Sequence, residues 1–334
     1  MNRRDAVFTF LALGATPLAA LAQQPKRKVN RVALIFTASP ISVMSGPEPS
    51  HPSVRAFVHE LRVLGYREGE NLILERRTAE GHFERFPDIV AELVRLKVDV
   101  IVTVGHEMAL AAKNVTTTVP IVMGNSYLDP VELGLVASLA RPGGNITGLT
   151  AAAGPGVEAK RVELMKTAIP KLRRLAFLGT KSDWEDAFGK SIHAAAKQLG
   201  VTLIHAEHTP ENYRGAFAMI LREHPDGVLI ANTPVNFANM RIIVDFMAKG
   251  GLPTMYNRRE YVEAGGLMAY GTDVPDLFRR AASYVDKILK GANPAELPVE
   301  QPMRFEFLVN MKTAKALGIT IPQSTLLRAD RVIE

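Results

Sequence analysis

The chain has 334 residues, of which 47% are apolar, 22% charged and 7% aromatic, a balance typical of a globular protein with a sizeable core. Its length favours two domains rather than one. The absence of cysteine excludes disulfides, thiolate metal sites, a cysteine nucleophile and a lipid attached through cysteine. The net charge of +6 comes from basic residues scattered among acids, so it indicates a solvated surface, and we expect no nucleic-acid partner.

The first 22 residues have the order of a secretory signal peptide. Arg3 and Arg4 precede an apolar stretch at 6–21, and the motif Ala-Leu-Ala that ends at Ala22 follows the form of a cleavage site. The apolar stretch is shorter than a membrane span. We therefore expect cleavage near Ala22 and a mature protein in the periplasm. The arginine pair leaves general secretion and twin-arginine export both open.

Strands and helices alternate along the first part of the mature chain. Short apolar runs predict strands at 32–36, 72–77, 98–104, 119–123 and 146–149. Apolar residues three or four positions apart predict helices at 54–64, 89–96, 108–113 and 130–140. This alternation predicts an open parallel sheet with helices on both faces.

A second series follows a loop at 151–156 that is rich in alanine and glycine. It predicts strands at 175–178, 201–206, 227–231, 253–256 and 267–270, and helices at 157–168, 187–199, 213–223 and 236–249. A further helix is expected at 275–289, after this series. Two such α/β units predict two Rossmann-like lobes joined by a hinge. We assign 30–147 with about 274–303 to the first lobe and 148–273 with about 304–334 to the second. The hinge is expected at 151–156 and near the strands at 146–149 and 267–271.

Ligands of open parallel sheets bind beyond the carboxyl ends of the strands, and polar residues follow several of the predicted strands. Gly105 either opens a helix whose first N–H groups suit an anion or makes only a tight turn. His106 and Glu107 are the one pair that we would nominate for general acid–base work. The candidate ligand-binding residues of the first lobe are Ser39, Gly105, His106, Glu107, Asn125 and Ser126.

The second lobe offers charged candidates. Arg258 or Arg259 would clamp a carboxylate, and Tyr256 would lend its ring face to an apolar side chain. Arg259 is also compatible with an exposed position at a helix start. Asp273 either accepts a ligand ammonium or caps the helix that follows it. The candidate residues here are Asn232, Thr233, Tyr256, Arg258, Arg259 and Asp273, and together they predict a carboxylate-bearing, amino-acid-like solute.

No catalytic or metal-binding pattern stands out in the sequence. It contains neither a G-x-S-x-G nucleophile elbow nor an H-E-x-x-H zinc motif. His205 and His208 have a spacing that suits metal binding on a helix, but they straddle a predicted strand end. We therefore expect no metal, no cofactor and no enzymatic activity.

Long blocks of the sequence resemble a known family, the bacterial ABC transporter substrate-binding proteins related to tryptophan-binding lipoproteins. The resemblance covers essentially all of the mature chain. The blocks are G-Y at 65–66 with G-x-N at 69–71, AELVRLKVDVIV at 91–102, PIV at 120–122, LVASLARPGGNITG at 135–148, EYVEAGGLM at 260–268, YVDKILKG at 284–291, LPVEQP at 297–302 and KTAKALG at 312–318.

The resemblance implies a type I periplasmic-binding-protein fold and the capture of a small solute for a membrane permease. Some relatives are similar to binders of aromatic amino acids. This chain departs from the family at two loops, where His106-Glu107-Met108 replaces Thr-Pro-Ala and the run at 126–130 replaces Gly-Asp-Pro. We expect a monomer. The alternatives are a ligand-binding sensor without transport, the effector-binding part of a repressor, and a cleft enzyme that uses His106 and Glu107.

Overall fold

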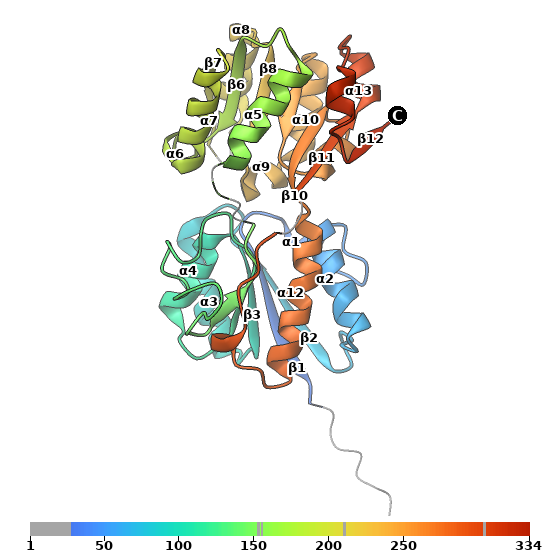
Figure 1. The fold of residues 1–334 in the computed structure, drawn as a ribbon. Helices are drawn as coiled ribbons and strands as arrows, with labels where there is room; N and C mark the ends of the chain where they lie inside the picture. The colour runs from blue at the N-terminus through green and yellow to red at the C-terminus, as the bar shows by residue number, and fades with distance from the viewer. Residues whose placement is uncertain (1–27, 152–153, 155, 210–211, 303–304) are drawn as a thin grey trace, which may run out of the picture.

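Two β-sheets divide the chain into two lobes, which lie one above the other in Figure 1. The structure is a computed structural model that describes residues 28–151, 154, 156–209, 212–302 and 305–334. The expected signal peptide at 1–22 lies outside these residues. None of the helices within the described ranges has both the length and the apolar character that crossing a bilayer demands.

The first lobe contains a five-stranded sheet of order β2-β1-β3-β4-β5, in which all neighbouring strands are parallel. In β1, Val32 and Leu34 pack against α2 and α12, whereas Ala33 and Ile35 pack against α3 and α4. This alternation buries both faces of the strand. The elements are β1 (Asn30–Phe36), α1 (Ile41–Met44), α2 (Pro52–Val63), β2 (Leu72–Thr78), the 3-10 helix η1 (Phe83–Arg85), α3 (Phe86–Arg95), β3 (Val100–Val104), α4 (His106–Val115), β4 (Ile121–Asn125), β5 (Ile146–Gly148), α12 (Val274–Leu289) and the 3-10 helix η2 (Pro294–Glu296).

The second lobe contains a seven-stranded sheet of order β12-β11-β10-β9-β8-β6-β7. In β6, Leu175 and Phe177 pack on the side of α5 and α7, while Ala176 and Leu178 pack on the side of α8 and α10. The elements are α5 (Gly156–Ala168), β6 (Arg174–Gly179), α6 (Lys181–Glu185), α7 (Ala187–Gln198), β7 (Thr202–Glu207), α8 (Arg214–Glu223), β8 (Gly227–Ile230), α9 (Pro234–Ala238), α10 (Met240–Lys249), β9 (Thr254–Tyr256), α11 (Arg259–Glu263), β10 (Met268–Thr272), β11 (Phe305–Asn310), α13 (Met311–Ala316), α14 (Gln323–Leu326) and β12 (Arg331–Ile333).

The predicted α/β fold class with two lobes is confirmed, but three local predictions were wrong. Residues 130–140 form turns instead of a helix, because Gly134 adopts a φ of 64° and the N–H of Leu135 returns to the carbonyl of Pro130. The helix expected at 236–249 breaks at Asn239, between α9 and α10. The second sheet is not purely parallel, since β11 runs antiparallel to β10.

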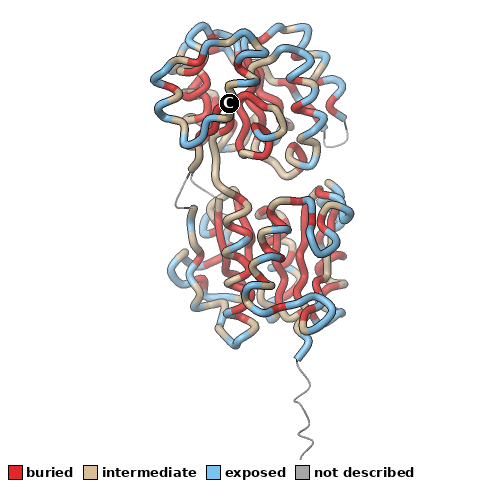
Figure 2. The backbone as a smooth tube through the Cα atoms, turned by 90° about the vertical axis from the view of Figure 1, so that its right-hand side faces the viewer, coloured by how far each residue is buried: buried red, intermediate tan, exposed pale blue. Residues whose placement is uncertain are grey.

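The chain passes between the lobes after β5, after β10 and before β11. Figure 2 shows the two lobes connected along one side of the molecule. Two of these passages are tied together, because the N–H of Thr150 donates to the carbonyl of Glu300 at 2.9 Å and the N–H of Glu300 to that of Gly148 at 3.0 Å. Part of the linker expected at 151–156, namely residues 152–153 and 155, lies outside the described residues.

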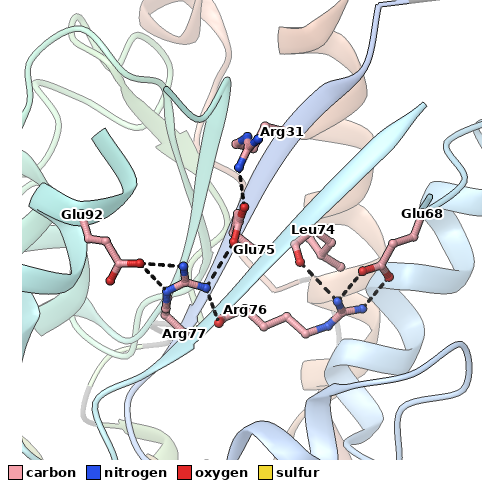
Figure 3. A network of polar contacts seen from close by, with 7 residues as sticks. All are labelled: Arg31, Glu68, Leu74, Glu75, Arg76, Arg77 and Glu92. Atoms are coloured by element: carbon pink, nitrogen blue, oxygen red, sulfur yellow. Dashed lines mark hydrogen bonds and ion pairs between the residues drawn. The ribbon is translucent and has the colours of Figure 1, made fainter. Parts of the chain in front are cut away.

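Edge strand β2 carries arginines that glutamates neutralise (Figure 3). The guanidinium of Arg76 contacts Glu68 at 2.6 Å, and that of Arg77 contacts Glu92 at 2.7 Å. Charged side chains on an edge strand hinder pairing with another chain. Because each arginine has an acidic partner, this edge is not a free cationic surface of the kind that binds nucleic acid.

Candidate functional site

A cleft lies between the lobes, at the carboxyl ends of β4, β8 and β9. It has two adjoining parts with cavity volumes of about 30 and 40 Å³, so the two lobes lie close together in this structure and leave room for little more than water. Both parts are lined by Tyr127, Glu158, Phe188 and Asn232. Tyr127 follows β4 of the first lobe and the other three belong to the second, so both lobes contribute to the wall.

Arg258 is the buried cation of the cleft. It follows β9, is 5% exposed, and lies over the ring of Phe237 at 4.3 Å. One guanidinium nitrogen donates to the hydroxyl of Tyr127, so this pair connects the two lobes. The Nε atom has no partner among the residues that the structure describes. Arg258 therefore retains an unused donor, as the sequence-based hypothesis of a carboxylate clamp requires.

The part of the cleft next to α6 and α7 is acidic. It is lined by Asp183 and Asp186 together with Phe177, Phe188 and Ile192. Burial raises the pKa of Asp186, although the N–H of Gly189 donates to it at 2.7 Å. His106 of the first lobe lies close enough to lower the pKa of Asp186. The start of α4 therefore faces the start of α7 across the cleft.

A buried ion pair supports the cleft wall behind these groups. Glu158 and Arg161 lie one turn apart on α5 and meet at 2.5 Å, with side chains 5% and 0% exposed. Arg161 also donates to the carbonyl of Ile230, at the end of β8, at 2.6 Å. Burial raises the pKa of Glu158 while the Arg161 charge opposes that shift. This pair fixes α5 against the strand ends that position the cleft residues.

None of the first-lobe candidates is among the described residues that line the two parts of the cleft. His106 lies near the acidic part, where it lowers the pKa of Asp186, and Glu107 is 3.5 Å from its Nε2 atom. Ser126 is fully buried, and its carbonyl accepts from Ala151 at 2.7 Å, so it anchors the passage between the lobes. Asn125 accepts from the N–H of Gly105 at 3.3 Å through its side chain.

The anion site expected at Gly105 has the wrong surroundings. Gly105 has a φ of 85° and begins α4, but its N–H is already bonded to Asn125. A carboxylate oxygen of Glu107 lies 2.9 Å from the position that a Cβ of Gly105 would take. The chain's own carboxylate thus lies beside this helix start, where an anionic ligand would meet repulsion. Ser39 is buried after β1 and is not among the described residues that line the cleft.

Three second-lobe candidates make structural contacts, and for Asp273 this is the helix cap that the sequence had left open. Tyr256 is fully buried in the core, stacked on Tyr261 at 4.6 Å, because alternation along β9 turns it away from the cleft. Arg259 pairs with Asp273 at 2.8 Å and with Glu306, so its charge is already neutralised near the passage from β10 to α12. Asp273 also accepts from the N–H of Asp276 at 3.1 Å and caps α12.

The remaining candidates of this lobe differ in role. Asn232 lines both parts of the cleft, and its side chain accepts from Asn257. Thr233 caps α9 by accepting from Asn236 at 3.1 Å, which is a structural role. No group of three or more histidine and acidic residues suited to a metal occurs within the described part of the chain.

The sequence-based search missed several residues that line the cleft. Tyr127 directly follows the candidate Ser126, and Asn257 directly follows the candidate Tyr256. A search over more residues after each strand would have included both. Phe188 and Asp186 stand at the start of α7, in the loop after β6 where only the first residues were considered. Glu158 gave no signal, because a carboxylate near a helix start is common on protein surfaces.

Comparisons with known proteins agree with this architecture. A model of the ABC transporter substrate binding protein family matches residues 44–333. A tyrosine-binding protein of Clostridioides difficile is 26% identical over 274 residues, which cover 80% of this chain and 78% of that protein. A conserved domain protein of Vibrio cholerae superposes with a TM-score of 0.78 at 26% identity, covering 91% of this chain and 100% of the other.

A domain from Streptococcus pneumoniae solved in complex with L-Trp gives a TM-score of 0.74 at 23% identity, covering 91% of this chain and 100% of that one. Its likeness shows the fold. Because the family model spans most of the sequence, both lobes and the cleft included, the chain belongs to the family of ABC transporter substrate binding proteins.

Proposed function

We propose that this chain is the extracytoplasmic solute-binding component of an ABC importer, which captures an amino-acid-like solute between its lobes and delivers it to a membrane permease. The observation that carries the ligand class is Arg258, a buried cation that lines the cleft with an unused donor. A buried guanidinium that keeps one N–H donor without a partner is well suited to a carboxylate. The tyrosine-binding relative supports an amino acid as the solute.

The contacts across the cleft support binding by closure of the lobes. Tyr127 belongs to the first lobe and Arg258 to the second, and they are hydrogen-bonded. His51 of α2's N-terminus packs on Phe237 of α9 at 5.5 Å between ring centres. The lobes must separate at these contacts before a solute can enter. The solute would be enclosed when the lobes close again. The solute would contact Tyr127, Asn232, Asn257 and Arg258, with His106 at the rim.

The rest of the assignment follows from the sequence. Residues 1–22 would direct export and be removed, leaving a monomer in the periplasm. The first lobe would comprise 30–147 and about 274–303, and the second 148–273 and about 304–334. The partners would be a small solute and a permease, without nucleic acid, metal or cofactor and without catalysis.

Calorimetry tests the proposal directly. The mature protein is titrated with L-tyrosine, L-tryptophan and, as a neutral solute, ribose. We expect one-to-one binding of an amino acid and none of ribose. Arg258→Gln should weaken that binding by about ten- to a hundredfold, since a hydrogen bond to a charged group contributes about 1.5–3 kcal/mol. Arg279→Gln, at a half-exposed arginine of α12, is the control. Binding of ribose alone, or full affinity in Arg258→Gln, would contradict the proposal.

A further inference from the structure

Arg259 connects the second lobe to the passages between the lobes. It begins α11, directly after the cleft residue Arg258, and is not among the described residues that line the cleft. One of its guanidinium nitrogens donates to Asp273 at 2.8 Å and also contacts Glu306. The side chains of Arg259, Asp273 and Glu306 are 28%, 30% and 31% exposed. Water and salt therefore reach this charge cluster in part, and its contacts are sensitive to ionic strength.

Asp273 stands where the chain passes from the second lobe to the first. Thr272, the residue before it, ends β10 of the second sheet, and Val274, the residue after it, belongs to the first-lobe core. The Oδ1 atom of Asp273 accepts from the N–H of Asp276 at 3.1 Å and so caps α12, while Oδ2 accepts from Arg259. A single carboxylate therefore binds the first turn of a first-lobe helix and an arginine of the second lobe.

Helix α12 belongs to the first lobe by its packing. It runs from the passage after β10 along the first lobe (Figure 1). Leu277, Ala281 and Val285 of α12 lie in the same core cluster as Phe57 and Leu61 of α2. A rotation of one lobe against the other therefore moves the start of α12 relative to α11. The pair of Arg259 with Asp273 joins these two helix starts while the lobes are in contact.

Glu306, the other partner of Arg259, lies within the second lobe. It belongs to β11 and is opposite Gly271 of β10 in the antiparallel ladder. Because α11, β10 and β11 are all parts of the second lobe, a rotation between the lobes leaves the contact of Arg259 with Glu306 intact. The same arginine thus makes one contact between the lobes and one within a lobe.

We propose that Arg259 is a positioning residue for solute binding: its ion pair with Asp273 holds the lobes in the closed orientation, and so it sets the affinity for a solute that it does not touch. This inference rests on the proposed function, because it requires lobes that close on a solute. A contact that is made in the closed form and lost in the open form favours closure. The apparent affinity follows the fraction of the closed form.

Substitutions at three residues separate the two contacts. Asp273→Asn removes the ion pair between the lobes and keeps the cap of α12, because asparagine is as good a cap as aspartate. Arg259→Gln removes both ion pairs and leaves two carboxylates close together, whereas Glu306→Gln removes only the pair within the second lobe. Arg279→Gln is the matched control, because its ion pair with Asp276 at 2.7 Å lies entirely within α12. Thermal unfolding of each variant checks that it is folded.

Calorimetry with L-tyrosine gives the affinity of each variant at low and high salt, about 50 and 500 mM NaCl. At low salt we expect Asp273→Asn to bind about three- to fivefold more weakly than the native protein, and Arg259→Gln about fivefold or more weakly. Glu306→Gln and Arg279→Gln should stay within about twofold of the native affinity. Since salt screens this partly exposed pair, the difference between Asp273→Asn and the native protein should fall below about twofold at high salt.

The outcomes separate the positioning role from the proposed function. If Asp273→Asn binds L-tyrosine with native affinity at low salt, the role of Arg259 is overturned and the solute-binding function stands. The role is also overturned if Glu306→Gln weakens binding as much as Asp273→Asn does, or if the loss in Asp273→Asn persists at high salt. A local distortion rather than the charge pair between the lobes would then be responsible. If the native protein binds neither L-tyrosine nor any other amino acid, the proposed function is overturned together with this inference.

Discussion

Lowering the pH from 7.5 to 5.5 is expected to weaken solute binding by about tenfold through His51 alone. His51 precedes α2 in the first lobe and is 6% exposed. Its ring packs edge-on against Phe36 at 4.7 Å and against Phe237 of the second lobe at 5.5 Å. The Nδ1 atom has no partner among the described residues. With the lobes together, His51 is thus held in an environment suited to a neutral ring.

Burial, aided by the nearby charge of Arg258, lowers the pKa of His51 from 6.5 to about 3. When the lobes separate, Phe237 and Arg258 move away, and we expect the pKa to return toward 6.5. The open form then binds one more proton than the closed form between these two values. Closure is therefore fully favoured above pH 6.5 and is progressively lost as the pH falls toward 3. One pH unit below 6.5 the penalty is about tenfold in affinity.

The assay is calorimetry with L-tyrosine at several pH values between 5.5 and 7.5, on the native protein and on His51→Asn. Asparagine does not titrate in this range, so the variant should lack the part of the pH dependence that His51 contributes. His59→Asn changes an exposed histidine of the same helix and should leave the native dependence intact. The reasoning is refuted if His51→Asn and the native protein lose affinity equally on acidification.

Three further predictions follow from the same contacts. Tyr127→Phe removes the hydroxyl that accepts from Arg258 across the lobes and should weaken solute binding by about tenfold or more by calorimetry; unchanged affinity would show that the contact is dispensable. Arg161→Leu leaves Glu158 buried without its partner and should lower the free energy of unfolding by about 3–5 kcal/mol in urea titrations, whereas a loss under about 1 kcal/mol would argue that water reaches the carboxylate. The native protein should gain about 2.7 kcal/mol of stability at a hundredfold excess of solute over Kd, and an unchanged melting temperature at saturation would speak against binding to the folded state.

The sequence could predict the fold because its signals are local. Burial of both faces of β1 and β6 follows from continuous apolar runs such as 32–36, and helix ends follow from glycine and proline. Antiparallel β11 was not predictable in this way, because strand direction depends on which edge of the sheet the chain reaches after it crosses between the lobes. The turns at 130–140 have an apolar spacing like that of a helix, and only the left-handed Gly134 distinguishes them.

The cleft was harder to predict because its properties depend on pairing between distant residues. Arg258 and Arg259 are equivalent in sequence, yet one lines the cleft and the other is neutralised by Asp273 and Glu306. Tyr256 was predicted to contact the ligand because its ring suits an apolar side chain. The alternation of side chains along β9 instead places it in the core. The charge balance of a cavity depends on residues from several elements, so it cannot be predicted from the residues that follow any single strand.

Identification of the solute that the native protein carries tests the central claim most directly. Protein purified without added ligand is washed, denatured, and the released small molecules are identified by mass spectrometry and counted against protein. We predict an unmodified solute that bears both an amine and a carboxylate, with an aromatic or aliphatic body, and that rebinds to the refolded protein. A released sugar, or a carboxylic acid without an amine, that rebinds one-to-one would contradict the assignment of the cleft at Arg258 to an amino-acid-like solute.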